Sequence, residues 1–433
     1  MANRKITVDH LCRVEGHGGV TVELKDGKVD KVQMDIYEAM RYFEHFLKRV
    51  PYDQTASIAC RICAICSAVH NIVSNQATED AFGVKCSDQT NLLRRLYVAG
   101  GNIESHALHV YLLALPDLME PRYHSALHMA QDLPEVAKIA LDIKKCGNEI
   151  QDIVGGREIH ACNTKLGGFG RIPKKDELKY LRDRLEKTLE NAAATVPIVK
   201  GLDVPAYLKS ENTYVGLVPY GDKFGYMGDK IAVSDGTVVD VHDYLNVTNE
   251  YVVPYSHAKF SAWKDKPFMV GAIARVHLFF DKLHPTAKAV AADIGYKPPI
   301  HNSLFNSVAQ VLELVDAIAD SIDVIDAVLA EYDGSPKDPV VKPKAGKGTA
   351  GIEAPRGTLY HSYEYDADGN CIGADIITPT CQNYGNMEKD IREMVENNPG
   401  FSDEDIHFHS EIIVRAYDPC ISCSVHVINL DKQ

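Results

Sequence analysis

Several features that would direct a chain to a membrane, a nucleic acid or a dinucleotide are missing from this sequence. No stretch approaches the roughly 18 uninterrupted apolar residues of a membrane-spanning helix, and the N-terminus, Met-Ala-Asn-Arg-Lys-Ile-Thr-Val, lacks the apolar core of a secretory signal. The 46 Lys and Arg residues are outnumbered by 60 Asp and Glu, and the net charge of -14 disfavours nucleic acid as a partner. No Gly-rich loop follows a strand and opens a helix, so no dinucleotide site is predicted. We therefore expect a cytoplasmic protein that does not span a membrane.

A secreted disulfide framework is also disfavoured, because the 11 cysteines are odd in number and spread over 433 residues. Four of them form two Cys-x-x-Cys pairs at opposite ends of the chain, Cys63 with Cys66 and Cys420 with Cys423. Each pair can place two thiolates on one metal ion, whereas a local zinc ribbon would close within roughly 15–20 residues. We predict one buried metal site at which both ends of the chain meet. The other cysteines are interpreted mostly as buried thiols that act as small apolar groups: Cys12, Cys60, Cys86, Cys146, Cys162, Cys371 and Cys381.

The hydrophobic pattern predicts an α+β fold that is mainly α, with a core of long helices and small peripheral β-sheets. We expect a single unit over residues 1–433. It would consist of a β-meander over 1–40, a helical core with the first cysteine pair over 41–200, a mixed insertion over 201–300, and a long helix, a hairpin and the second pair over 301–433.

Local signals carry these assignments. Asp26-Gly27 is a hairpin signal between alternating strands, and residues 307–332 keep one apolar face before Gly334 and Pro336. Residues 339–348, rich in Pro, Gly and Lys, are predicted to be an exposed connection. A hairpin is expected around Asp366 to Gly369, and the apolar run 412–414 is expected to lead to the second cysteine pair as a strand or a helix.

The cysteine motifs stand within a longer ordered set that resembles the large subunit of nickel-iron hydrogenases. Arg61-Ile-Cys-Ala-Ile-Cys66 with His70, and Asp418-Pro-Cys-Ile-Ser-Cys423 with His426, are similar to the two signatures of that family. The further matching segments occur in the family's order: Arg13-Val-Glu-Gly-His17, Arg41-Tyr-Phe-Glu44, Ser105-His-Ala-Leu-His109, Gly156-Arg-Glu-Ile-His160, Gly167-Gly168, Glu353-Ala-Pro-Arg-Gly357 and Thr378-Pro-Thr380. The chain looks most like the cytoplasmic bidirectional and methyl-viologen-reducing members, and the resemblance implies both the large-subunit fold and reversible cleavage of dihydrogen.

The resemblance implies a nickel-iron centre on the four cysteines. Cys63 and Cys420 would be terminal nickel ligands, while Cys66 and Cys423 would also bridge to an iron that carries carbon monoxide and cyanide. A thiolate has lone pairs for two metals, so bridging is chemically reasonable. By the same resemblance Cys420 would be the first proton acceptor, and Glu15 would pass the proton onward.

Other roles also follow only from the resemblance. Arg356 would lie over the open metal face, and His70 would hydrogen-bond a bridging sulfur. Pro379 and Thr380 would shape the pocket around the iron's diatomic ligands, with the Thr380 hydroxyl as a cyanide donor. For Asp418 two roles are expected together, capping the turn that presents Cys420 and orienting Arg356.

A second metal site is implied near the C-terminus. Glu44, His426 and the main-chain carbonyl of Ile376 match the family's ligands for magnesium or a similar divalent ion. Taken without the family pattern, Glu44 and Glu15 would be read as solvated carboxylates, and Arg356 as one partner of a surface salt bridge.

Four departures from the family pattern limit the transfer. Ala64 replaces the usual glycine between the first two cysteines, and Ser105 stands where many respiratory members have an aspartate. Cys60 adds a third cysteine at the same spacing, which in isolation resembles part of an iron-sulfur motif. Residues 427–433 follow His426, where a protease usually cleaves. We expect this tail to be compatible with an active site, and an active enzyme whose mass ended at His426 would contradict that expectation.

The resemblance further implies partners. We expect an iron-sulfur small subunit to pack on the cysteine-bearing face, with further electron-transfer subunits of a flavin, ferredoxin-like or disulfide-reductase type. Two other interpretations remain at this point, a non-catalytic metal scaffold and a relative of the quinone-site subunit of respiratory complex I. The second is weak because that relative has lost the metal cysteines, and all four are present here.

Overall fold

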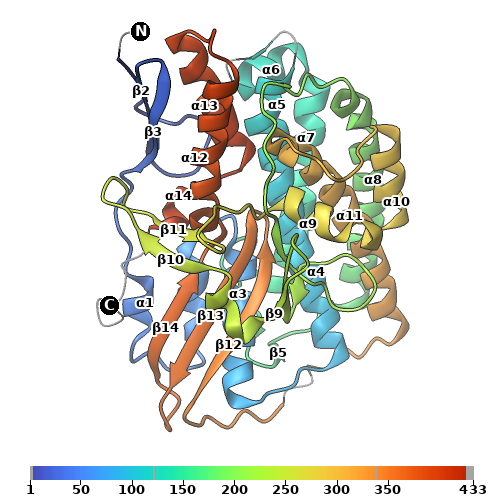
Figure 1. Cartoon of the computed structure of the whole chain (residues 1–433). Helices are drawn as coiled ribbons and strands as arrows, with labels where there is room; N and C mark the ends of the chain where they lie inside the picture. The colour runs from blue at the N-terminus through green and yellow to red at the C-terminus, as the bar shows by residue number, and fades with distance from the viewer. Residues whose placement is uncertain (1–2, 120–121, 124, 337–338, 426–433) are drawn as a thin grey trace.

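The computed structural model describes residues 3–119, 122–123, 125–336 and 339–425 (Figure 1). Long helices form one side of the molecule, and an antiparallel sheet with shorter helices forms the other (Figure 1). The predicted α+β class, mainly α with a core of long helices, is confirmed.

The N-terminal meander is present as predicted. Strands β1 (Arg4–Val8), β2 (Gly18–Lys25) and β3 (Lys28–Ile36) pair antiparallel in that order. The β2–β3 turn has positive φ at Asp26 and at Gly27, the conformation that tight hairpins require. One face of the meander packs on helix α12 (Pro379–Asn397), so the two ends of the chain lie side by side (Figure 1).

The bundle consists mainly of α4 (Asp88–Ala107), α7 (Pro134–Gly155), α8 (Lys175–Lys200) and α11 (Asn306–Ala330), and the last is the long helix expected from its apolar face. Glycine allows α4 and α7 to approach closely, because a Cβ at Gly147 would stand 2.6 Å from the Gly100 carbonyl oxygen. One feature was not predicted: α4 continues as the π-helix η2 (Leu108–Ala114), a form often found at functional sites.

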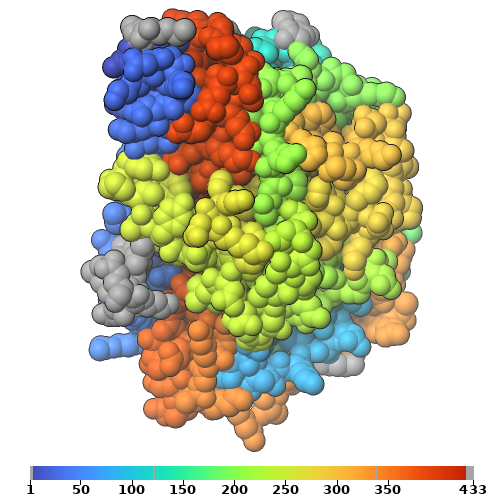
Figure 2. Space-filling view, in the orientation of Figure 1, coloured from blue at the N-terminus to red at the C-terminus, as the bar shows by residue number. Residues whose placement is uncertain are grey.

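The main sheet lies deeper than predicted. Its order is β14 (Cys371–Ile377), β13 (Gly357–Tyr365), β12 (Gly346–Ala354), β7 (Met227–Gly228), with β13 and β14 forming the predicted hairpin. Helix α3 (Ser67–Phe82) covers β12 and β13, whose residues are almost all buried. Residues 346–348, predicted to be exposed connection, begin β12, and the 201–300 insertion contributes β7 to this sheet. The rest of that insertion covers the front of the molecule (Figure 2).

The C-terminal part ends at the second cysteine pair. Residues 412–414, expected to be strand or helix, lie in α13 (Asp403–Ala416), which is followed by the short α14 (Ile421–Ser424). In the part of the chain that the structure describes, no helix is long and apolar enough to cross a bilayer. The remaining elements are α1 (Phe43–Leu47), α2 (Thr55–Ala59), η1 (Cys60–Ile62), α5 (Leu115–Leu118), α6 (Ala126–Asp132), β4 (Thr164–Lys165), β5 (Gly168–Phe169), β6 (Val215–Leu217), β8 (Lys230–Val233), β9 (Val238–Asp240), η3 (Val241–Asn246), β10 (Asn249–Val252), β11 (Lys259–Ala262), α9 (Ala272–Phe279), η4 (Phe280–Lys282), α10 (Pro285–Asp293) and η5 (Ser303–Phe305).

Candidate metal centre

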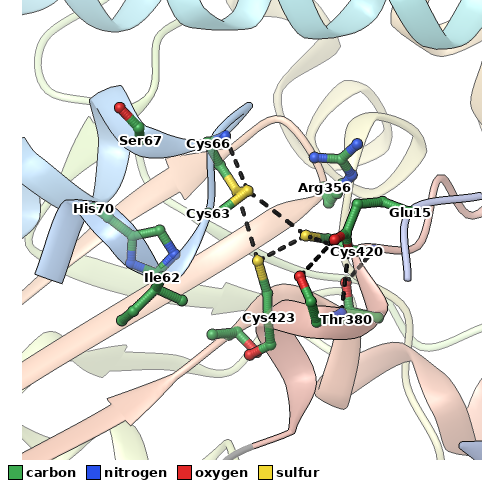
Figure 3. The surroundings of a disulfide bond; sticks show 12 residues. Glu15, Ile62, Cys63, Cys66, Ser67, His70, Arg356, Thr380, Cys420 and Cys423 are labelled. Atoms are coloured by element: carbon green, nitrogen blue, oxygen red, sulfur yellow. Dashed lines mark hydrogen bonds between the residues drawn. A yellow bond between two sulfur atoms is a disulfide. The ribbon is translucent and has the colours of Figure 1, made fainter. Parts of the chain in front are cut away.

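The two cysteine pairs meet in the interior, as predicted. All four sulfurs, those of Cys63, Cys66, Cys420 and Cys423, lie within 4.8 Å of one another and are buried (Figure 3). Across the pairs, the Cys63 and Cys420 sulfurs are 3.6 Å apart and those of Cys66 and Cys423 are 3.8 Å apart. Within the first pair a disulfide joins Cys63 to Cys66. Only the reduced form of this pair offers two thiolates to a metal.

Local structure places each sulfur. Cys63 follows η1 in an extended conformation, and Cys66 precedes the first turn of α3, whose N-terminus favours negative charge. The backbone N–H of Cys66 donates to the Cys63 sulfur at 3.1 Å. On the other side Cys420 precedes α14 and Cys423 lies within it. A hydrogen bond with Cys423, together with burial, raises the pKa of the Cys420 thiol well above its ordinary value.

Glu15 lies against the second pair, although it is more than 400 positions away in the sequence. Its carbonyl accepts from the N–H of Ile421 at 3.0 Å. Its carboxylate accepts from the Cys420 thiol at 3.2 Å, and from the N–H and hydroxyl of Ser422 at 3.1 and 2.5 Å. The structure therefore brings together Cys420 and Glu15, the pair expected to carry the proton.

Two arginines hold the Glu15 segment in place through one buried carboxylate. Arg13 and Arg415 both donate to Asp117, at 2.5 and 2.6 Å, and Arg415 also donates to the carbonyl of Cys12 at 3.2 Å. This cluster ties the N-terminal segment to α13, which leads to the second cysteine pair. Arg13 belongs to a motif that was recognised in the sequence, but Asp117 carries no such signal, because its contact with the two arginines exists only in the folded chain.

Arg356 occupies the tight turn between β12 and β13. Ala354 pairs with Gly357, so Pro355 and Arg356 form a two-residue loop. Gly357 has φ of 132°, and a Cβ there would meet the Val270 side chain at 2.3 Å, so only glycine fits. The turn directs Arg356 toward the cysteines from the side of Cys420 (Figure 3).

The side chain of Arg356 is buried and ion-paired. Its Nε and Nη2 donate to Asp418 Oδ1 at 3.1 and 3.0 Å, and Nε also donates to the Asp418 carbonyl at 2.7 Å. Burial alone would lower the pKa of Arg356, but Asp418 and the neighbouring Cys420 and Cys423 raise it above its ordinary value. Its remaining terminal nitrogen, Nη1, is buried with no hydrogen-bond partner among the described residues.

For Asp418, one of its two predicted roles is present. Its carboxylate bonds Arg356 and also accepts from Gln310 Nε2 at 3.1 Å. The turn-capping role is wrong, because the N–H of Cys420 donates to Thr380 Oγ1 instead, at 3.0 Å. The steric reason is that Asp418 has positive φ and its side chain extends toward Arg356.

Helix α12 begins beside the second pair and supplies the predicted threonine. Pro379 occupies its first turn, where no N–H is needed, and this places the Thr380 hydroxyl at Cys420. Thr378 Oγ1 donates to the Cys423 carbonyl at 3.0 Å. Both hydroxyls therefore fix the backbone of the cysteine loop.

His70 lies on the far side of the first cysteine pair from Arg356 (Figure 3). Its Nδ1 is 3.0 Å from Nε2 of His361, a residue that the sequence did not indicate. Burial lowers the pKa of His70 to about 3, so the ring is neutral. Because Nδ1 is engaged with His361, only Nε2 is left to reach a sulfur, and that predicted contact stays a prediction.

The proposed second metal site is only partly described, because His426 lies outside the described residues. Glu44 Oε1 accepts from the N–H of Ile376 at 3.0 Å, which brings these two predicted residues together. Lys259, which the sequence did not indicate, places its Nζ 3.8 Å from Glu44 and contacts Glu250. Burial raises the pKa of Glu44 to about 7, although Lys259 opposes the shift.

Comparison with known proteins gives the family. The family model described as nickel-dependent hydrogenase matches residues 41–131 and 226–426, and a model described as HoxL-like matches residues 5–39. The chain is 39% identical over 425 residues to the alpha chain of sulfhydrogenase 1 from Pyrococcus furiosus, covering 98% of each chain. It is 34% identical over 431 residues to the alpha chain of sulfhydrogenase 2 from the same organism, covering 98% of this chain and 100% of the relative.

Solved structures agree with these sequence relatives. An NAD+-reducing [NiFe]-hydrogenase in the H2-reduced state superposes with a TM-score of 0.87 at 26% identity, covering 98% of this chain and 99% of the other. A [NiFeSe]-hydrogenase of Dm. baculatum, at 24% identity and a TM-score of 0.75, shares the fold over 98% of this chain and 100% of its own. Because the family model and the relatives together span almost the whole chain, and the family's four cysteines meet at one buried point, the chain belongs to the nickel-dependent hydrogenase family as a large, catalytic subunit.

Proposed function

We propose that this chain cleaves dihydrogen reversibly into protons and electrons at a nickel-iron centre held by Cys63, Cys66, Cys420 and Cys423, with Cys420 as the first proton acceptor. One observation carries the proposal: four buried sulfurs lie within 4.8 Å of one another, and a carboxylate lies 3.2 Å from one of them. A soft metal requires the sulfurs, and heterolytic cleavage requires the neighbouring base.

The residues present fit such a centre. Four thiolates are a donor set for soft and borderline metals, and they form once the Cys63–Cys66 disulfide is reduced. The orphaned Nη1 of Arg356 is a buried donor beside the sulfurs, and it suits an anionic ligand on the metal such as cyanide. We therefore propose that the iron would carry carbon monoxide and cyanide, that Cys66 and Cys423 would be the cysteines that hold it, and that Pro379 and Thr380 would form part of the wall around these ligands. When bound, the centre supplies the Lewis acidity that polarises dihydrogen and accepts its electrons.

The chain's own residues would then move the proton. Cys420 holds it first, since its sulfur donates directly to the Glu15 carboxylate. Glu15 receives it, and Ser422 bonds both carboxylate oxygens, which fixes their orientation. Both Glu15 and Ser422 are partly exposed, so the proton can leave toward the surface from this pair.

Arg356 would act as a fixed positive charge over the site. Its pairing with Asp418 occupies Nε and Nη2 and leaves Nη1 for a ligand. We propose that His70, neutral and bound to His361, uses Nε2 to donate to a bridging sulfur. These donors would offset part of the negative charge of four thiolates.

We also propose a divalent ion, magnesium or similar, bound by Glu44, the Ile376 carbonyl and His426. The charge balance supports it, because Glu44, Glu250 and Asp375 interact in a partly buried cluster with Lys259 as their counter-ion. A hard cation with oxygen ligands would neutralise the excess negative charge.

The electrons from dihydrogen must pass to another protein. We propose that an iron-sulfur small subunit receives them and that further electron-transfer subunits follow. Met40, Tyr42 and Phe46 form an exposed apolar surface beside the centre. Arg41, within that surface, donates to the carbonyls of Ile62 and Ser422, which adjoin the two cysteine pairs. A partner that covers these side chains would therefore reach both pairs.

We propose a cytoplasmic location. Among the described residues the cysteines outside the Cys63–Cys66 pair form no disulfide, which fits a reducing compartment.

Anaerobic infrared spectroscopy of the purified complex tests the function. We expect stretching bands of metal-bound carbon monoxide and cyanide, one nickel per chain, iron in excess of nickel because the small subunit also holds iron, and hydrogen-dependent reduction of a viologen dye. Stoichiometric zinc without those bands would identify a structural scaffold and refute the proposal. The variant Cys423→Ser should lose the bands, whereas Cys371→Ser, a buried cysteine outside the cluster, should keep them.

A further inference from the structure

A second buried chain of hydrogen bonds leads from the π-helix to Arg356. His109, in η2, has Nδ1 2.5 Å from Gln310 Oε1, and Gln310 Nε2 donates to Asp418 Oδ2 at 3.1 Å. Asp418 in turn binds Arg356 through its other carboxylate oxygen. His109, Gln310, Asp418 and Arg356 are all at least nine-tenths buried. The proposed proton route and metal ligation use neither His109 nor Gln310.

The direction of the amide follows from its charged neighbour. Asp418 accepts from the guanidinium of Arg356, so its carboxylate is an acceptor and must receive a donor from Gln310. If the amide were reversed, its oxygen would face a carboxylate oxygen at hydrogen-bond distance, with no proton between them. Gln310 therefore presents Nε2 to Asp418 and Oε1 to His109.

The orientation of the Gln310 amide determines which ring nitrogens of His109 carry a proton. Because Oε1 only accepts, Nδ1 must carry a hydrogen. The other nitrogen, Nε2, is 2.8 Å from the main-chain carbonyl of Arg415, which is also only an acceptor, so Nε2 must carry a hydrogen too. Rotating the ring by 180° would replace both nitrogens with carbons and lose both bonds. The geometry requires an imidazolium, with a proton on each nitrogen.

The surrounding charges allow a buried cation. Asp418 is the acidic group at the end of the chain from His109, and Glu313 lies one helical turn along α11 from Gln310. The nearby Arg415 shares Asp117 with Arg13 and also lies 3.5 Å from Glu411, so two carboxylates face these two arginines. The four sulfurs beyond Arg356 add negative charge when they are thiolates, so positive charge on this side of the site is compensated.

Another chain of buried hydrogen bonds, which starts at His106, can be compared with the one that starts at His109. His106, one turn before His109, bonds Glu313 at 2.8 Å, and Glu313 binds Arg275 through two bonds. Arg275 donates to the carbonyl of Pro355 at 3.0 Å, within the turn that carries Arg356. That chain fixes the backbone of the turn, whereas the chain through His109 reaches the guanidinium.

We propose that His109 is an imidazolium and that, through Gln310, it positions Asp418 so that Arg356 keeps Nη1 directed at the metal pocket. His109 and Gln310 are positioning residues, since they touch neither metal nor substrate. The charge assignment stands on the hydrogen-bond geometry alone, and the effect on turnover rests on the proposed function.

Nuclear magnetic resonance of the complex labelled with 15N-histidine tests the charge. We expect one histidine with both ring nitrogens protonated, and the loss of its signals in His109→Gln. If the signals lost in that variant belong instead to a neutral ring, with one protonated and one bare nitrogen, the proposal is overturned. This measurement needs no hydrogenase activity, so a chain without hydrogenase activity would leave its result intact.

Kinetics of two variants test the positioning. Gln310→Glu sets a negative charge against Asp418, and Gln310→Met removes the amide at similar length. In both we expect kcat for dihydrogen oxidation to fall about tenfold, with KM for dihydrogen within about twofold and nickel content unchanged. The control is Ser321→Ala, in the same helix, where the Ser321 hydroxyl donates to the carbonyl of Ala317. If either Gln310 variant folds, holds nickel and keeps the control's kcat, positioning is refuted.

Discussion

The substitution Glu15→Gln separates proton transfer from structure at one position. It keeps the shape of the side chain but removes its ability to take up a proton. The main-chain bond from Ile421 to the Glu15 carbonyl does not involve the side chain, so the segment should keep its place. Its neighbours are the Cys420 thiol and the N–H and hydroxyl of Ser422.

The structural cost can be worked out from these contacts. The glutamine oxygen can face Cys420 and the N–H of Ser422, while its NH2 group meets the Ser422 hydroxyl, which can rotate to accept. Three hydrogen bonds to a carboxylate become bonds to a neutral amide, and at roughly 1 kcal/mol for each the loss of stability is about 3 kcal/mol. General acid-base transfer contributes about 10²–10⁴ in rate, so turnover should fall about a hundredfold or more.

The assay is hydrogen-dependent viologen reduction by the purified complex, with nickel and iron measured in the same samples. Both metals should be unchanged, because Glu15 is not a proposed ligand. Ser422→Ala is the matched control, since it removes one donor and keeps the carboxylate, and it should retain more than about a tenth of the turnover. Full metal content with near-normal turnover in Glu15→Gln would refute the proton route through this carboxylate.

Three further predictions concern other parts of the chain. Arg356→Lys cannot make the two-donor contact with Asp418, so it should keep nickel but lose about tenfold or more in turnover; near-normal turnover would remove Arg356 from the mechanism. Glu79→Gln removes the counter-ion of the buried Arg94 guanidinium, so it should lower the unfolding free energy by about 3–5 kcal/mol in a denaturant titration. A loss below about 1 kcal/mol would contradict this prediction. Burial raises the pKa of Asp316 to about 7, so the contribution of Asp316 to stability declines as pH rises from about 4 to 7. Asp316→Asn should abolish up to about 4 kcal/mol of that decline in the unfolding free energy. A variant with the same pH profile of stability as the parent would refute this role of Asp316.

The site's sulfurs could be predicted from the sequence because the two Cys-x-x-Cys pairs stand within an ordered set of family motifs, and the whole set is a strong signal for metal. The meander and the long helix could be predicted too, since their patterns are local. By contrast, the partners of these groups come from distant segments. Lys259 beside Glu44, Asp117 between two arginines, and Gln310 beside Asp418 carry no pattern of their own.

Two features of the site could not be predicted from the sequence because they depend on the folded structure. The π-helix after α4 differs from an α-helix by hydrogen-bond register, which residue preference does not encode, yet it contains His109. Proximity in sequence makes Asp418 a candidate cap for the turn at Cys420, but the hydroxyl of Thr380, from another helix, accepts the hydrogen bond from the N–H of Cys420. Where tertiary contacts hold a buried loop, the residues next to it in the sequence do not identify its hydrogen-bond partners.

X-ray absorption at the nickel edge, measured on the anaerobically purified complex, tests the nickel-iron assignment most directly. We predict one nickel per chain with sulfur as its dominant ligand and an iron neighbour, and loss of the sulfur signal when Cys63 and Cys420 are both replaced by serine. Nickel bound mainly by nitrogen and oxygen, or four cysteines occupied by zinc, would contradict the assignment.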